Sequence, residues 1–150
     1  MMAVLLWVSL QSNAQVNLDS IWNVWDDSSI VDSTRIDALL ELSHQYLHIN
    51  PDSSLLLAKQ AFKMASTRSL ENRMAKGLLL QGYYHYLRAE FNEAMEFANS
   101  SLEICLKNKK RYKIEIRYNL IANIYSGLGF YNKAIEYQLK SLKFSKEHFE

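Results

Sequence analysis

Two histidines at a metal-chelating spacing are the first residues in this sequence whose types could carry chemistry. His44 and His48 are four residues apart, which places both imidazoles on the same side of a helix. The residues between them are Gln, Tyr and Leu, so the Glu that follows the first His in zinc proteases is missing. The sequence places no third ligand near them, and we therefore expect no metal site.

Other patterns typical of an active site are missing from the sequence. Cys105 is the single cysteine, which excludes an intramolecular disulfide and a thiolate metal cluster. A lone Cys on the apolar side of a helix is typically a small core residue. No glycine-rich phosphate loop, nucleophile elbow or catalytic carboxylate pair appears. We expect no catalytic residues, no cofactor and a protein that is not an enzyme.

Charge is balanced overall but unevenly distributed. The net charge is +1, and it runs from −5 in residues 1–60 (two basic, seven acidic) through 0 in 61–105 to +6 in 106–150 (ten basic, four acidic). The strongest basic run is KNKKRYK, residues 107–113. We interpret this run as a polar connector between helices, with a nucleic-acid or lipid surface as the alternative. We expect no nucleic-acid partner.

The first residues have the pattern of an export signal. Residues 1–10, MMAVLLWVSL, form an apolar run too short to span a bilayer, and Ser12 and Ala14 are small residues at a signal-peptidase spacing. The basic residue that normally precedes such a run is missing. We predict a signal peptide at 1–14 and an extracytoplasmic, periplasmic or secreted protein, with a short buried helix as the alternative.

The elements that would position any functional residue are predicted to be helices. Hydrophobic residues make up 49% of the 150 residues, and only one Pro and four Gly are available for turns between strands. Apolar residues recur at helical spacing. We predict an all-α chain with helical segments at about 18–25, 33–48, from 53 onward, 71–88, 92–106, 112–128 and 131–148. Asp32, Ser33 and Thr34 offer the first long helix an N-cap, and Asn50 and Pro51 separate it from the next.

The sequence repeats itself at an offset of 40 residues. EFNEAMEFANSSL, residues 90–102, has the same plan as FYNKAIEYQLKSL, residues 130–142. The offset extends back to a weaker first copy, so that three copies cover about 35–74, 75–114 and 115–150, after a leader at 15–32. A helical hairpin that cannot cover its own second face needs the next hairpin stacked on it.

The second and third copies resemble the tetratricopeptide repeat (TPR). They match its small, aromatic and alanine positions at Gly82, Phe91, Ala94 and Ser101, and at Ala122, Tyr125, Tyr131, Ala134 and Ser141. The period of 40 exceeds the family's usual 34. The resemblance implies a right-handed α-solenoid over about 33–150, in which these residues pack the repeats and the aromatic residues at 91 and 131 fill the turns. His85 takes a position where the family prefers an aromatic, which favours a packing role.

The resemblance also implies a binding groove and a function. In this family four positions on the first helix of each repeat line a groove for a protein or peptide ligand; here they are Lys76, Leu79, Tyr83, Tyr86, Ile116, Asn119, Asn123 and Ser126. The signal, the leader and the long repeats together resemble the N-terminal periplasmic TPR region of Bacteroidetes-like bacterial signalling proteins. A histidine kinase, a DNA-binding regulator or a cyclase follows the array in that group.

The last predicted helix carries an apolar stripe of Ile135, Leu139 and Leu142 without a following helix to cover it. We expect an array truncated at its C-terminus, with further repeats or a downstream domain as partners and a membrane contact only through a missing C-terminal segment. A partner that covers the stripe is the alternative. The predicted function is a non-catalytic interaction or sensory module of a signalling protein. A free-standing adaptor is the first alternative, and a metal-binding or nucleic-acid-binding protein is the second.

Overall fold

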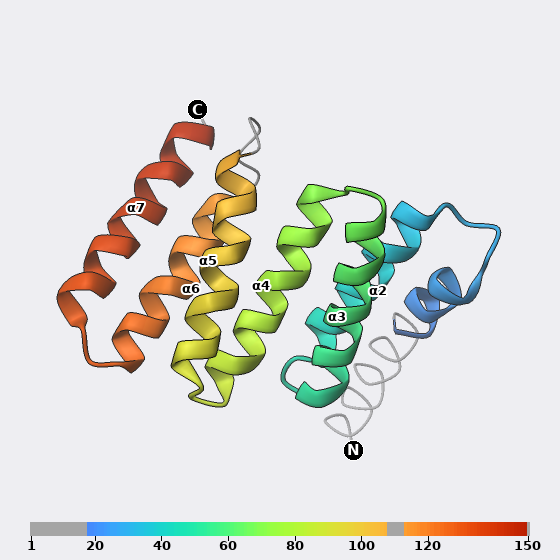
Figure 1. Ribbon diagram of the computed structural model, residues 1–150, viewed down its shortest axis with the longest axis horizontal. Helices are drawn as coiled ribbons and strands as arrows, with labels where there is room; N and C mark the ends of the chain where they lie inside the picture. Colours follow the sequence, from blue (N-terminus) through green and yellow to red (C-terminus); the bar gives the residue numbers. More distant parts are fainter. Residues whose placement is uncertain (1–17, 108–112, 150) are drawn as a thin grey trace, which may run out of the picture.

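All regular secondary structure that the computed structural model describes, over residues 18–107 and 113–149, is helical. Residues 18–26 form a short helix, as predicted. The longer helices that follow are α2 (Asp32–Tyr46), α3 (Pro51–Thr67), α4 (Glu71–Leu87), α5 (Phe91–Lys107), α6 (Ile114–Gly127) and α7 (Tyr131–Phe149). They follow one another from the N-terminal to the C-terminal end of the molecule (Figure 1). The predicted all-α class is confirmed.

The helices form three hairpins that stack in sequence order. Within the hairpins, α2 packs on α3, α4 on α5 and α6 on α7. Neighbouring hairpins meet where α3 contacts α4 and α5 contacts α6, and the first helices also touch directly, α2 with α4 and α4 with α6. This is the arrangement of a helical solenoid, because each hairpin covers the face that its neighbour leaves open.

The start of α2 differs from the prediction. Its N-cap residue is Val31, with no side-chain capping hydrogen bond, so the expectation that Asp32, Ser33 or Thr34 would cap the helix is wrong. Asp32 accepts a hydrogen bond from Arg68 Nε at 2.8 Å, across the hairpin from α3. A carboxylate in the first turn still complements the helix dipole, so the ion pair and the dipole both stabilise this position.

The start of α3 follows the predicted local chemistry. The Asn50 side chain accepts a hydrogen bond from the Ser53 amide at 3.1 Å, which satisfies one of the free amides of the first turn. Pro51 is the first helical residue, where its missing N–H costs nothing. The helix therefore begins at Pro51, slightly before the predicted Ser53.

Three helices end in the same backbone motif. Ser69, Ala89 and Gly129, which follow α3, α4 and α6, have φ of 53°, 58° and 80°. In each turn the amide after this residue bonds a carbonyl of the helix's last turn, as Glu90 N does with His85 O at 2.9 Å. This is the Schellman motif, in which a left-handed residue satisfies the helix's last carbonyls and reverses the chain.

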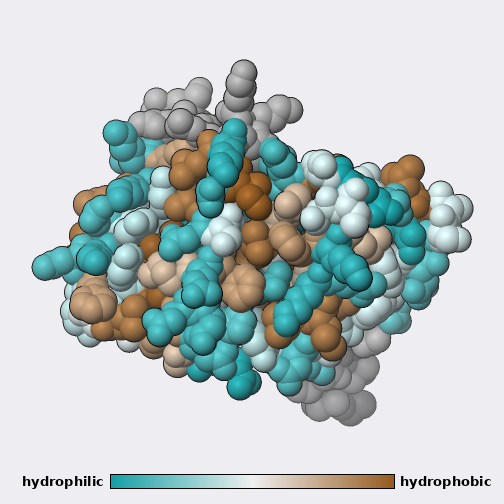
Figure 2. All heavy atoms as spheres, viewed as in Figure 1, coloured by the Kyte–Doolittle hydropathy of each residue, from teal (hydrophilic) through white to brown (hydrophobic). Residues whose placement is uncertain are grey.

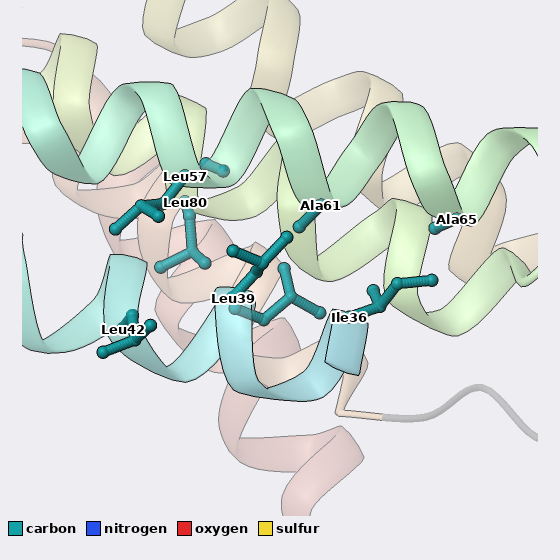
Figure 3. Close-up of a cluster of buried hydrophobic side chains, with 9 residues drawn as sticks. Ile36, Leu39, Leu42, Leu57, Ala61, Ala65 and Leu80 are labelled. Atoms are coloured by element: carbon teal, nitrogen blue, oxygen red, sulfur yellow. The ribbon is translucent and has the colours of Figure 1, made fainter. Parts of the chain in front are cut away.

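The core of the first hairpin is a cluster of aliphatic side chains. Figure 3 shows residues of α2 and α3 converging, joined by one residue of α4; the cluster consists of Ile36, Leu39, Leu40, Leu42, Leu57, Ala58, Ala61, Ala65 and Leu80. The short helix at 18–26 closes the end of this cluster with Trp22 and Trp25. Arg35 holds that helix by donating from Nε to the Trp25 carbonyl at 2.9 Å. A second cluster joins α4, α5 and α6.

Small residues lie where the helices approach most closely. Ala94 and Ala122 are buried, and Ala134 is nearly so. A methyl group added to Gly82 would lie 3.0 Å from Leu120 Cδ2, so this glycine brings α4 close to the first helix of the next hairpin. Within the hairpin the approach is looser, since the nearest α5 atoms are 3.5 Å from the added methyl group.

The aromatic residues at the turns behave differently in the two copies. The Phe91 ring packs against Gly127, where an added methyl group would lie only 2.6 Å from the ring. Tyr125 lies between α6 and α7, with its ring centroid 5.5 Å from that of Tyr137. Tyr131, the counterpart of Phe91, is 67% exposed and does not fill its turn. The reason is that Phe91 packs on the following hairpin, whereas the described residues include no hairpin after α7.

The described surface mixes polar and apolar side chains. On the face seen in Figure 2, hydrophobic residues lie in separate patches among hydrophilic ones. Within residues 18–107 and 113–149, none of the helices combines the length and apolar character that a membrane crossing requires.

Candidate functional site

A pocket of about 550 Å³ lies among the first helices of the three hairpins. We call it the groove pocket, and its lining residues are Glu41, His44, Leu47 and His48 of the first hairpin, Lys76, Leu79, Leu80, Tyr83, Tyr86 and Leu87 of α4, and Lys113, Ile116 and Arg117 at the start of α6. Because α2 and α6 both contact α4, the pocket depends on the stacking of all three hairpins.

The spacing of residues along α4 forms the floor of the groove pocket. Lys76, Leu79, Tyr83 and Tyr86 follow one another at intervals of three and four, so they share one helical face. Leu79 is almost fully buried, whereas Tyr83 and Tyr86 are half-buried. Burial raises the pKa of the Tyr83 hydroxyl above its usual value, while nearby Arg117 acts in the opposite direction. Tyr83 therefore offers a neutral hydroxyl beside the apolar side chain of Leu79.

Cationic side chains outnumber acidic ones in the groove pocket. Lys76, Lys113 and Arg117 contribute three positive charges against one negative charge from Glu41, a net of +2 with neutral histidines. Lys76 Nζ lies 3.9 Å from Glu41 Oε2, which links α4 to α2 at one edge. The excess positive charge favours a ligand with an acidic group.

Arg117 is fixed within the wall of the groove pocket. It is only 2% exposed. Its Nε donates to Ser101 Oγ at 3.1 Å and its Nη1 to the Lys113 carbonyl at 2.8 Å. Ser101 Oγ in turn donates to the Ala75 carbonyl at 2.6 Å. The chain of bonds ties α6, α5 and α4 together, so the cation is held in place before any ligand arrives.

Comparison with known proteins identifies the fold. No family model and no curated protein sequence matches the chain. Among solved structures, the crystal structure of the TPR domain of Arabidopsis FLU superposes with a TM-score of 0.68 at 18% sequence identity, covering 75% of this chain and 95% of that one. The chain has a tetratricopeptide-repeat fold. The predicted resemblance of the hairpins to TPR units is thereby confirmed at the level of the fold.

The TPR pattern places five of its eight predicted groove residues in the groove pocket: Lys76, Leu79, Tyr83, Tyr86 and Ile116. The other three, Asn119, Asn123 and Ser126, lie further along α6 and do not line it. Asn119 and Asn123 are half-buried and Ser126 is exposed. Only the start of α6 thus lines the pocket, whereas the groove positions predicted from the TPR pattern continue to the end of α6.

The wall from the first hairpin was missed by the sequence analysis. The 40-residue offset from Leu79 and Tyr83 leads back to Leu39 and Ser43, which are both fully buried in the core. The residues that face the TPR groove pocket lie on another side of α2 and just after it, beginning with Glu41 and His44. The sequence signal for this wall was the four-residue spacing of His44 and His48, which places both side chains on one side of the helix. The sequence alone suggested only a chelating pair.

The remaining candidates for chemistry are a metal site, the thiol of Cys105 and the imidazole of His85. Among the described residues, no three His, Cys, Asp or Glu side chains cluster closely enough to hold a metal ion. Cys105 is 2% exposed and its burial raises the pKa of the thiol, which disfavours the nucleophilic thiolate. His85 stacks on Phe97 at a centroid distance of 5.2 Å and its Nδ1 lies 2.7 Å from Glu90 Oε2, in line with the predicted packing role.

Most of the basic run falls outside the described residues, which omit 108–112. Its two described ends differ in their surroundings. Lys107 Nζ donates to Glu103 Oε1 at 2.7 Å on the surface of α5. Lys113 has a φ of 50° at the N-cap of α6 and lines the groove pocket. Lys113 therefore brings one positive charge of the basic run into the pocket lining.

Proposed function

We propose that this chain is a protein-interaction module that binds a polypeptide segment in the groove pocket and performs no chemistry itself. The observation that carries the proposal is a pocket built across all three hairpins, with Leu79 and two tyrosines on its floor and cationic side chains around it, of which Arg117 is fixed. Tyr83 and Tyr86 offer large contact areas with little loss of side-chain entropy. A few polar groups around an apolar floor are typical of a site that fixes one orientation of its ligand.

The lining favours a segment with an apolar anchor and an acidic group. Leu79, Leu80 and Ile116 would surround the anchor. Lys113 and Arg117 would lie near the acidic group, and because Arg117 is already fixed by Ser101, little side-chain entropy is lost on binding. The pocket is too small for a whole protein domain, so the rest of the partner would contact the neighbouring surface of the solenoid.

The proposal is tested with peptides selected from a displayed random library on the full chain. Leu87 lines the pocket and is 44% exposed, so Leu87→Glu changes the site without burying a charge in the core. We expect its affinity for the selected peptides to fall about tenfold. The matched control is Leu56→Glu, at an exposed position of α3 outside the pocket, which should bind normally. Equal binding by both variants would contradict the proposal.

We further propose that the module works outside the cytoplasm as the N-terminal sensory part of a bacterial signalling protein. The support comes from the sequence: an apolar run followed by Ser12 and Ala14, an acidic leader, and long-period repeats. A free-standing adaptor is the second candidate, favoured if no signalling domain is encoded together with this chain.

Mass spectrometry of the protein from its native cells tests the location. We expect the extracytoplasmic fraction to contain a chain that begins at Gln15. An intact Met1 in the cytoplasmic fraction would contradict the export proposal without affecting the binding proposal. Sequencing the gene beyond the Glu150 codon separates the sensor from the adaptor.

A further inference from the structure

The outer face of α7 carries a stripe of exposed apolar side chains. Tyr131, Ile135, Leu139 and Leu142 are 67%, 59%, 60% and 52% exposed, and their spacing of four, four and three residues places them on one face. We call this set the α7 stripe. It is separate from the groove pocket, which takes no residue from α7. In Figure 1, α7 forms the outermost helix at the C-terminal end.

The α7 stripe has a counterpart inside the molecule that shows what such a face binds. Forty residues earlier, Phe91, Met95 and Leu102 on α5 are the counterparts of Tyr131, Ile135 and Leu142, and they pack against the cluster that contains Leu120, Ile121 and Ile124 of α6. The counterpart of Leu139 is Asn99, which is exposed. The ring of Phe91 rests on Gly127 at the end of the same helix. This face of α5 thus receives a helix with an apolar side and a small residue near its end.

The charges beside the stripe distinguish α7 from α5. Over the whole of α7, Lys133, Lys140, Lys143 and Lys146 stand against Glu136 and Glu147 in the sequence, a net of +2. On α5 the corresponding sum is −2, from Glu93, Glu96, Glu103 and Lys107. Lys146 lies four residues after Leu142, so it continues the stripe toward the end of the helix. A helix that binds here must therefore complement positive charge.

We propose that the α7 stripe is a docking surface for an acidic amphipathic helix of a partner protein. The helix packs on α7 as α6 packs on α5: apolar residues cover Ile135 and Leu142, a small residue receives Tyr131, and acidic residues flank Lys143 and Lys146. A second copy of this chain is a poorer occupant. Two α7 helices would bring +2 against +2, and such like-charge contacts oppose association.

Two synthetic helical peptides test the proposal on the full chain. Both keep the apolar residues of α6 and are held helical by a side-chain staple on the polar face, because a free peptide of this length is marginally helical. The acidic peptide carries Arg117→Glu, Asn119→Glu and Asn123→Glu, and the basic peptide carries Glu115→Lys, Asn119→Lys and Asn123→Lys. By fluorescence anisotropy at low salt, we expect the acidic peptide to bind about tenfold more tightly, and the difference to shrink at high salt.

Substitutions on α7 locate the binding. Ile135→Lys should weaken binding of the acidic peptide by about tenfold. Leu56→Lys, at an exposed position of α3, should leave it unchanged. The combined Lys143→Glu and Lys146→Glu change should reverse the preference, so that the basic peptide now binds more tightly. Circular dichroism checks that each variant keeps its helical content.

Three results would overturn the proposal. The first is equal or tighter binding of the basic peptide to the unaltered chain. The second is failure of both peptides to bind. The third is a dimer in light scattering that Ile135→Lys converts to a monomer, which would assign the stripe to a second copy of the chain.

Discussion

At the scale of single residues, the turns of this protein depend on a backbone conformation that only glycine adopts without strain. Gly129 takes it at the end of α6, but Ala89 takes it at the equivalent place after α4 with a φ of 58°. Both turns make the same pair of amide-to-carbonyl bonds. The alanine therefore holds a left-handed conformation against the clash of its Cβ with the neighbouring carbonyl oxygen.

Exchanging the residue types at these two turns should have opposite effects. We expect Ala89→Gly to raise the free energy of unfolding by about 0.5 to 1 kcal/mol, because the relief of strain exceeds the added entropy of the unfolded chain. Gly129→Ala should lower it by a similar amount, although the site has open space around it. Urea denaturation followed by circular dichroism measures both. A stabilised Gly129→Ala variant would show that the turn can relax.

At the scale of the elements, a buried serine joins the two helices of a hairpin in two of the copies. Ser101 Oγ donates to the Ala75 carbonyl at 2.6 Å, and Ser141 Oγ donates to the Glu115 carbonyl at 3.0 Å. These are equivalent positions at the 40-residue offset. The TPR pattern requires a small residue here, and the structure adds a hydrogen bond between the helices. In the second hairpin the same hydroxyl also accepts from Arg117.

The two serines should differ in their contribution to stability. We expect Ser101→Ala to lower the free energy of unfolding by about 1 to 3 kcal/mol, because it removes both of these bonds at a fully buried site. Ser141→Ala removes one bond, and its effect should be about 0.5 to 1.5 kcal/mol. Thermal and chemical denaturation provide the comparison. Equal losses from the two variants would show that the Arg117 bond contributes nothing.

At the scale of the whole molecule, the core is divided along the solenoid. The cluster around Leu39 holds α2 and α3 together with Leu80 of α4, whereas the second cluster joins α4, α5 and α6. Among the described helices, contacts between hairpins occur only between neighbours. Stability in such an array is approximately a sum of hairpin terms and nearest-neighbour interface terms. A substitution that destabilises one hairpin should therefore have its largest effect on that hairpin and its direct neighbour.

Amide hydrogen exchange, measured helix by helix, can test this division of the core when one core side chain is shortened. Leu39 is fully buried, and Leu39→Ala should cost about 2 to 5 kcal/mol through lost burial and a residual cavity. We expect amide exchange to accelerate strongly in α2 and α3, less in α4, and least in α6 and α7. Mass spectrometry of peptic fragments measures it. A uniform acceleration along the chain would instead indicate a single cooperative unit.

The sequence by itself determined the helices and the hairpin repeat, because these depend on local spacing and on short-range turn chemistry. The Asn50 cap, the glycine at 129 and the small residues at 94 and 134 all act within one hairpin or one turn. The floor of the groove pocket was also predictable in part, since Lys76, Leu79, Tyr83 and Tyr86 share one face of a single helix.

Only the tertiary structure decided which other residues meet that floor. The face that a helix turns toward its neighbour depends on how two hairpins pack, and α2 presents Glu41 and His44 where the repeat offset points to buried residues. The same holds for Phe91 and Tyr131, which are equivalent in sequence. Phe91 is covered because Gly127 of the next hairpin lies against its ring, whereas Tyr131 is exposed because no described hairpin lies against it. The burial of a residue therefore depends on its neighbour in space as well as on its own type.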